Sequence, residues 1–250
     1  MSERIWITGA GTGIGRELAL AYARRGAKVW ISGRRESVLA QVVAQASDFN
    51  GEIHALVLDV TDANACSQAW ARLLQESGGL ERIILNAGDH REMPANEFSQ
   101  ATIEHLMNVN FFGVTRIMDS ALPWLAKHGG QLAIVASLAG YRGLPLAAAY
   151  GASKSALINM TEALRAELSS TSVDIRLINP GFVRTPLTDQ NQFEMPSLIN
   201  ADEAAKCIIR GLDGSGFEIR FPTGFAATLR FLSMLPYSLY FALIRKITDK

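Results

Sequence analysis

Cysteine is scarce in this sequence, and nothing in it is spaced like a metal site. The 250 residues include two cysteines, Cys66 and Cys207, which lie far apart in helix-like sequence and are interpreted as buried thiols. The acidic residues form no cluster, so we expect no metal. The histidines show no paired spacing and are interpreted as structural or surface residues: His54, His90, His105 and His128.

An excess charge of either sign is also missing. Lysine and arginine number 24, as do aspartate and glutamate, so the net charge is zero and nothing electrostatic favours a nucleic-acid partner. The apolar run in the opening MSERIWITGA is too short to be a signal-peptide core. We therefore expect a cytoplasmic protein.

The chain also lacks linkers, repeats and low-complexity segments. Hydrophobic residues make up 48% and charged residues 19%, enough for a large core. Apolar runs predict strands at 4–8, 28–32, 53–59, 82–86, 131–137, 173–179 and 217–221. Helical patterns lie between them, at 14–25, 36–47, 64–77, 99–127, 150–169 and 202–212. This alternation predicts an α/β fold, a three-layer doubly wound Rossmann domain with a seven-stranded parallel sheet.

The first strand leads into a glycine-rich turn and then a helix. Gly9, Gly13 and Gly15 form a G-x-x-x-G-x-G pattern. Such a turn lets a pyrophosphate approach the backbone at a helix N-terminus, although a turn without a ligand is the alternative. The residues predicted to bind a dinucleotide here are Gly9, Thr12, Gly13, Ile14 and Gly15.

The end of the second strand bears on which dinucleotide is bound. The sequence WISGRRES places Gly33 before Arg34 and Arg35, with no acid until Glu36. Two guanidinium groups favour the 2′-phosphate of NADP(H) over NAD(H). A solvated loop is the alternative.

Several separated motifs resemble those of the short-chain dehydrogenase/reductase family in its single-domain form, over roughly residues 4–221. They are TGAGTGIG, LDVTD, LNAG, VNFFG, ASLAG, YGASK and NPGFVRT. Leu85 stands where the family's NNAG has its first asparagine. The resemblance implies further cofactor contacts at Asp59, Val60, Asn86, Ala87, Gly88, Tyr150, Lys154, Pro180, Gly181, Val183 and Thr185.

The resemblance also implies four catalytic residues. Tyr150 would be the general acid or base, Lys154 would hold the nicotinamide ribose, and Ser137 would orient the substrate carbonyl. Asn110, in an otherwise apolar helical pattern, would hold a water that relays protons to the lysine. Residues i and i+4 share a helix face, so Lys154 is expected to lie beside Tyr150 and to lower its pKa.

A lone Y-x-x-x-K pair is a weak signal, because helix surfaces produce it by chance. Ser137, thirteen residues upstream of Tyr150, and the ordered set of motifs favour an enzyme. A non-catalytic NADP(H)-binding sensor or scaffold would be expected to have lost Ser137, Tyr150 or Lys154. A sugar-nucleotide epimerase would need a larger domain after the last strand.

Specificity is expected in the segments that follow strand ends, at 89–98, 138–149 and 182–201. Leu138, Tyr141, Leu144 and Leu146 indicate an apolar wall, and the third segment is long enough to be a mobile lid. This favours a mid-sized, partly apolar carbonyl or alcohol substrate. The predicted substrate contacts are Ser137, Leu138, Leu144 and Tyr150.

Residues 223–250 extend beyond the predicted catalytic domain at 1–222. Residues 231–244 are fourteen uncharged positions, fewer than the ~20 of a membrane span, and Pro236 should interrupt them. Three interpretations remain open: packing against another subunit of a homodimer or homotetramer, peripheral membrane contact through 224–247, or a cover over the substrate site. Membrane contact would favour a lipid-derived substrate.

Overall fold

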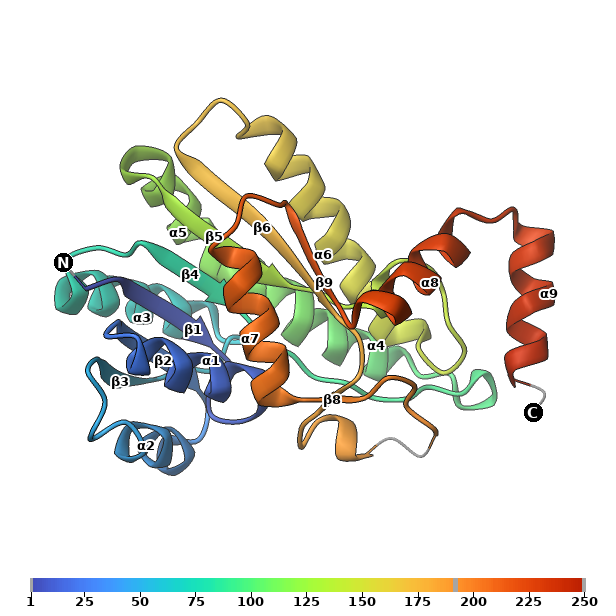
Figure 1. Ribbon diagram of the computed structural model, residues 1–250, viewed down its shortest axis with the longest axis horizontal. Helices are drawn as coiled ribbons and strands as arrows, with labels where there is room; N and C mark the ends of the chain where they lie inside the picture. The colour runs from blue at the N-terminus through green and yellow to red at the C-terminus, as the bar shows by residue number, and fades with distance from the viewer. Residues whose placement is uncertain (1, 191–192, 249–250) are drawn as a thin grey trace.

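A seven-stranded parallel sheet forms the centre of the computed structural model, which describes residues 2–190 and 193–248 (Figure 1). The strand order is β3-β2-β1-β4-β5-β6-β9, and the parallel sheet predicted from the sequence is confirmed. The strands are β1 (Arg4–Thr8), β2 (Lys28–Gly33), β3 (Glu52–Val57), β4 (Arg82–Leu85), β5 (Gly130–Val135), β6 (Val173–Pro180) and β9 (Glu218–Phe221).

Both faces of the sheet are buried, which explains why its strands are continuous apolar runs. Side chains alternate between the two faces along β1. Ile5 and Ile7 pack in one core and Trp6 in the other, and all three are fully buried.

Helices cover each face of the sheet in a separate layer (Figure 1). The first layer contains α1 (Gly13–Arg24), α2 (Glu36–Ala44) and α7 (Ala201–Leu212). The second contains α3 (Ala63–Ser77), α5 (Gly113–His128) and α6 (Ala148–Glu167), with α4 (Gln100–Met107) beside α6. The strand order reverses between β1 and β4, because β2 and β3 lie on one side of β1 and the later strands on the other. In folds of this kind ligands bind at the carboxyl ends of the strands beside that point.

Three expectations change in the structure. The helix predicted over 99–127 is divided by a π-helical turn, Asn108–Phe112, between α4 and α5. The segment predicted as a mobile lid contains two short paired strands, β7 (Val183–Arg184) and β8 (Ile199–Asn200), and its residues 191–192 lie outside the described chain. Cys66 is buried as expected, whereas Cys207 is only partly buried because it lies at the edge of the first core.

The C-terminal extension folds as two helices, α8 (Thr223–Met234) and α9 (Tyr237–Thr248), which Pro236 separates as predicted. Its residues 249–250 are outside the described chain. In Figure 1 both helices lie beyond the carboxyl ends of the strands. Within 2–190 and 193–248, no helix has the length and apolarity needed to cross a bilayer.

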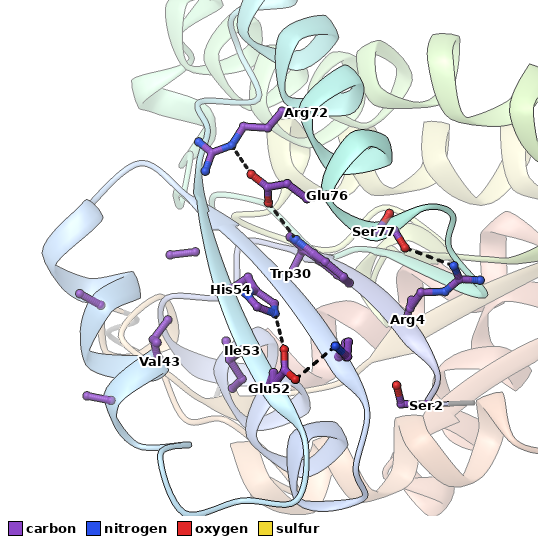
Figure 2. Close-up of a pocket in the computed structure, with 14 residues that line it drawn as sticks. Ser2, Arg4, Trp30, Val43, Glu52, Ile53, His54, Arg72, Glu76 and Ser77 are labelled. Atoms are coloured by element: carbon purple, nitrogen blue, oxygen red, sulfur yellow. Dashed lines mark hydrogen bonds and ion pairs between the residues drawn. The ribbon is translucent and has the colours of Figure 1, made fainter.

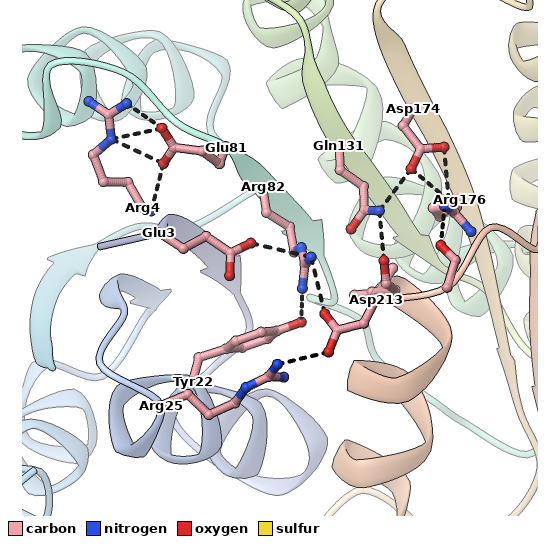
Figure 3. A network of polar contacts seen from close by, with 12 residues as sticks. Glu3, Arg4, Tyr22, Arg25, Glu81, Arg82, Gln131, Asp174, Arg176 and Asp213 are labelled. Carbon is pink, nitrogen blue, oxygen red and sulfur yellow. Dashed lines mark hydrogen bonds and ion pairs between the residues drawn. The ribbon is translucent and has the colours of Figure 1, made fainter. Parts of the chain in front are cut away.

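Charged side chains tie the amino ends of the strands to the helices (Figure 3). Arg82, which starts β4, is only 8% exposed; it contacts Glu3 at 3.3 Å and Asp213 at 3.5 Å, and donates to the Tyr22 hydroxyl. Burial raises the pKa of Tyr22 to about 12, despite the nearby guanidinium. A buried guanidinium needs such partners, so this group links the sheet to α1 and to the end of α7.

Removing the guanidinium should destabilise the fold. We expect Arg82→Ala to lower the free energy of unfolding by about 3 kcal/mol, because Glu3 and Asp213 lose a buried partner. Arg25→Ala is the matched control, since Arg25 also pairs with Asp213 but is 52% exposed, and should cost less than about 1 kcal/mol. Urea unfolding measures both, and equal losses would contradict this account.

Candidate active site

The glycine turn after β1 packs so closely against neighbouring segments that a side chain at its glycines would clash with them. Gly9 has φ of +65°, and a Cβ there would lie 2.7 Å from the Ala87 backbone. A Cβ on Gly15 would lie 2.5 Å from the Gly9 carbonyl oxygen, and one on Gly13 would lie 2.9 Å from Thr185. Three glycines therefore let the turn sit directly against the end of β4 and the segment after β6.

Helix α1 starts inside this turn with its first N–H groups uncapped by a side chain. Thr12 is the residue before the helix and makes no side-chain hydrogen bond to it. Ile14 packs its side chain on the first core. The turn thus presents backbone at a helix N-terminus, as predicted.

Asn86 fastens the turn to β4. Its Nδ2 donates to the carbonyls of Thr8 and Gly9, both at 3.0 Å, while the Thr8 hydroxyl accepts from the backbone N–H of Asn86 at 3.0 Å and Ala87 at 3.1 Å. Both amide hydrogens of Asn86 are therefore engaged within the protein, so its side chain positions the turn.

The ends of β2 and β3 form the second part of the predicted cofactor site. Arg34 and Arg35 are exposed there, and Arg35 precedes α2. Burial works to raise the pKa of Asp59, but two hydrogen bonds from Thr61 and the charges of Arg34 and Arg116 outweigh it, so this pKa lies below its usual value. Val60 is nearly buried, and a Cβ on Gly113 of α5 would lie 2.7 Å from it.

Ser137, Tyr150 and Lys154 converge beyond the end of β5. The Ser137 Oγ accepts from Ala139 N–H at 3.1 Å, and Ser137 also hydrogen-bonds Tyr150. The Lys154 Nζ donates to the Val135 carbonyl at 3.0 Å and lies 5.8 Å from the centre of the Tyr150 ring. The structure thus brings together the three residues that the sequence separates.

The electrostatics of this cluster differ from the sequence-based expectation. Burial raises the pKa of Tyr150, and the hydrogen bond with Ser137 only partly opposes it. Burial also lowers the pKa of Lys154 to about 8, because its side chain is almost enclosed at 4% exposure. The expected lowering of the tyrosine pKa by the lysine is therefore wrong for this structure: burial of the phenol outweighs its hydrogen bond with Ser137.

Asn110 occupies the π-helical turn and is fully buried. Its Oδ1 accepts from Asp89 N–H at 2.7 Å, and its Nδ2 donates to the Asp89 carbonyl at 3.0 Å and to Ser153 Oγ at 2.9 Å. Ser153 donates in turn to the Tyr150 carbonyl at 2.7 Å. Asn110 thus joins α6 to the segment after β4, and Ser153 is a positioning residue that was not among those predicted from the sequence.

Gly88 lies beside both Asn110 and Lys154. A Cβ there would lie 3.2 Å from Asn110 Oδ1 and 3.4 Å from Lys154 Nζ. A side chain at this position would therefore press against both polar groups.

His90 lies against the tyrosine, contrary to its interpretation as a structural or surface residue. The two rings meet edge to face, with centres 4.6 Å apart. Burial lowers the pKa of His90. Its place two residues after LNAG, within the predicted specificity segment at 89–98, was a signal that could have identified it.

The other histidines fit the sequence-based interpretation better. His105 contacts Asp89 at 2.6 Å, and His128 Nδ1 donates to the Trp124 carbonyl at 2.8 Å. His54 contacts Glu52 at 3.0 Å in a surface depression between α2 and α3, beside the edge strand β3 (Figure 2). None of the predicted cofactor or catalytic residues lines that depression, and its Trp30 and Glu76 are bonded to each other at 3.2 Å.

The segment after β6 closes the opposite side of the cluster. The Pro180 carbonyl accepts from Ser137 Oγ at 3.5 Å, and Val183 pairs with Ile199 in the small sheet. A Cβ on Gly181 would lie 3.3 Å from Leu138 and 3.2 Å from Phe225 of α8. The C-terminal extension therefore reaches the site.

Apolar side chains gather beside Ser137, but not all of those predicted. Leu138 is buried, and the ring of Phe182 lies 5.7 Å from those of both Phe193 and Phe225. Tyr141 departs from the predicted wall, because its hydroxyl donates to Glu218. Leu144 is partly buried in the turn before α6, and Leu146 is exposed.

Comparison with known proteins agrees with this arrangement. Residues 3–195 match the family model described as short chain dehydrogenase. An uncharacterized oxidoreductase of Myxococcus xanthus is 35% identical over 96% of each chain. An 11-beta-hydroxysteroid dehydrogenase-like protein of Arabidopsis thaliana is 33% identical, over 88% of this chain and 73% of the other. A 3-oxoacyl-[acyl-carrier-protein] reductase of Thermotoga maritima is 30% identical, over 74% and 75%.

Solved structures share the fold. A short-chain dehydrogenase/reductase of Burkholderia phymatum in complex with NAD superposes with a TM-score of 0.84 at 23% identity, over 92% of each chain. Actinorhodin polyketide ketoreductase with NADPH gives a TM-score of 0.80 at 23% identity, over 90% of this chain and 97% of the other. The matched motifs, the parallel sheet and these relatives lead to one conclusion: the chain belongs to the short-chain dehydrogenase/reductase family, whose members are oxidoreductases acting on CH–OH or C=O groups.

Proposed function

We propose that this protein interconverts a ketone or aldehyde and an alcohol with NADP(H), on a mid-sized and partly apolar substrate. The observation that carries the proposal is the convergence of Ser137, Tyr150 and Lys154 beyond the end of β5, at the carboxyl ends of the strands. A non-catalytic sensor of the same fold would not need all three.

The residues around the glycine turn fit a dinucleotide. Gly9, Gly13 and Gly15 leave no side chain over the backbone, and the start of α1 has no side-chain cap competing with a phosphate. Relatives in fold are known with NAD and with NADPH, which supports a nicotinamide cofactor of either kind. When bound, the cofactor supplies hydride to the carbonyl carbon or accepts it from the alcohol.

Proton transfer falls to Tyr150. With its pKa raised by burial, the phenol keeps its proton near neutral pH, which is the form that can donate to a developing alkoxide. The Ser137 hydroxyl, bonded to Tyr150, is placed to orient the same oxygen. Lys154 is mainly charged at neutral pH with a pKa of about 8, and its charge favours the phenolate that forms as the proton leaves.

The preference for NADP(H) rests on Arg34 and Arg35. Both guanidinium groups are exposed at the end of β2, where a 2′-phosphate could be held by charge-assisted hydrogen bonds. The nearest acid along the chain is Glu36, which starts α2.

The substrate proposal rests on Leu138 and on the cluster of Phe182, Phe193 and Phe225, which form an apolar side to the catalytic hydroxyls. Two relatives are named for a hydroxysteroid and for a 3-oxoacyl substrate, and steroids and acyl chains are largely apolar, which supports the same class here. Assembly as a homodimer or homotetramer and a cytoplasmic location stay predictions from the sequence.

Substitution of the proton donor tests the mechanism. Tyr150→Phe should lower kcat for NADPH-dependent ketone reduction by about 10³-fold, since the ring remains and only the acid is lost. NADPH absorbance with ketones of graded chain length would identify a substrate and measure the rate, and fluorescence titration should find NADPH binding nearly intact. Tyr237→Phe, on exposed α9, is the control; retained turnover in Tyr150→Phe would remove this residue from the mechanism.

Cofactor preference can be tested at the end of β2. The double variant Arg34→Ala, Arg35→Ala should raise KM for NADPH by about tenfold or more and leave KM for NADH unchanged, because only the 2′-phosphate loses partners. Arg210→Ala, an exposed arginine on α7, should change neither value. A wild-type preference for NADH would refute the proposal.

Burial of Lys154 should be measurable as a pH-dependent cost to stability. Between its folded pKa of about 8 and its ordinary 10.5, the unfolded chain binds more protons, so the free energy of unfolding rises with pH. The cost is about 3 kcal/mol at pH 7 and should fall by about 1 kcal/mol at pH 9.

The variant Lys154→Met lacks this cost, so its stability relative to wild type should decline between pH 7 and pH 9. Loss of the hydrogen bond to Val135 changes the free energy of unfolding by the same amount at every pH, so it does not affect this trend. Lys127→Met, on an exposed lysine, should show no such trend in urea unfolding of the cofactor-free protein. A difference in unfolding free energy between Lys154→Met and wild type that is the same at pH 7 and pH 9 would contradict the account.

A further inference from the structure

Large apolar side chains are exposed together on the two C-terminal helices. Their exposed fractions run from 39% to 71%, and large apolar side chains exposed on adjacent helices are typical of a surface that binds a partner. We call it the α8–α9 face, and it consists of Phe231, Met234, Tyr237, Leu239, Phe241 and Leu243.

Every charged residue between 219 and 248, the part of the extension that the structure describes together with the end of β9, is basic. No acidic residue occurs between Glu218 and Asp249, although the whole chain is neutral. Arg230 is exposed on α8, and Arg245 and Lys246 are exposed in the last turn of α9. An apolar surface with a basic border complements anionic lipid, in which apolar side chains enter the interface and cations meet the headgroups.

From these observations we infer that the α8–α9 face binds the surface of an anionic lipid bilayer without crossing it. A second copy of the chain fits this face less well. A twofold interface would bring the basic borders of two copies together, and residues 219–248 contain no carboxylate that would offset their charge. Because the inference concerns a partner surface, it stands apart from the proposed function.

The two helices are fixed to the body of the protein through the segment that follows Ser137. Arg142 donates to the carbonyls of Leu232 at 3.0 Å and Ser233 at 3.1 Å, which ends α8. Its guanidinium also lies 4.1 Å from the centre of the Tyr240 ring and 4.7 Å from that of Tyr237.

Tyr240 completes the attachment. It is buried, and its hydroxyl donates to the Gly143 carbonyl. The exposed side chains of α9 are therefore held in place by Tyr240 and Arg142, so the face is preformed. Its attachment also places bound lipid next to the segment 138–147.

Vesicle co-sedimentation of the full chain tests the inference. The wild type should bind phosphatidylcholine vesicles containing about one-third phosphatidylserine at least tenfold more strongly than phosphatidylcholine alone, and salt should weaken the binding. Phe241→Glu should bind the anionic vesicles about tenfold more weakly than wild type, because a carboxylate in the interface repels anionic lipid. Val57→Glu is the matched control, because Val57, on β3, is 49% exposed and Phe241 is 54% exposed. This control variant should bind the vesicles as strongly as wild type.

Charge reversal provides a second variant that does not alter the apolar face. Arg245→Glu with Lys246→Glu should reduce binding to the anionic vesicles by about tenfold or more and leave thermal unfolding unchanged. Failure of the wild type to sediment, or equal binding by both variants and wild type, would overturn the inference. So would a wild-type dimer in sedimentation equilibrium that Phe241→Glu converts to a monomer, because a second copy would then cover the face.

Discussion

The enclosed amino group of Lys154 is the constraint around which the site is organised. Its Nζ donates to the Val135 carbonyl and has little access to solvent, so its neighbours must be small or polar. Gly88 leaves the space beside it open, and Asn110 provides a polar group on the same side. The desolvation that lowers the lysine pKa also raises that of Tyr150, and the proposed proton transfer depends on both.

The two ends of the sheet have different roles. At the amino ends, Arg82, Asp213 and their neighbours hold strands and helices together with buried and half-buried charges. At the carboxyl ends, Asn86 holds the glycine turn with neutral hydrogen bonds, and glycines keep the surface bare. Stability and ligand binding are thus separated along the strands, as is usual for open parallel sheets.

Much of this could be predicted from the sequence because the signals were local. The apolar runs predicted all seven strands, and the motifs placed Ser137, Tyr150 and Lys154 at strand and helix ends that the structure brings together. Those motifs carried positional information that composition lacks.

The missed features depend on contacts between distant segments. The π-helical turn at Asn110 forms with hydrogen bonds to Asp89 and Ser153, and Tyr141 turns away from the site because Glu218 lies across the sheet. The pKa of Tyr150 was expected to fall because sequence spacing reveals the neighbouring charge but not the depth of burial. The attachment of α9 through Arg142 and Tyr240 was hidden for the same reason.

The central claim, that the Lys154 amino group is desolvated beside Tyr150, can be tested by direct titration of that amine. The protein would be labelled with 13C at lysine Cε, and its NMR signals followed with pH, using Lys154→Met to assign the resonance. The account predicts a pKa of about 8 in the cofactor-free protein, and a value near the ordinary 10.5 would contradict it.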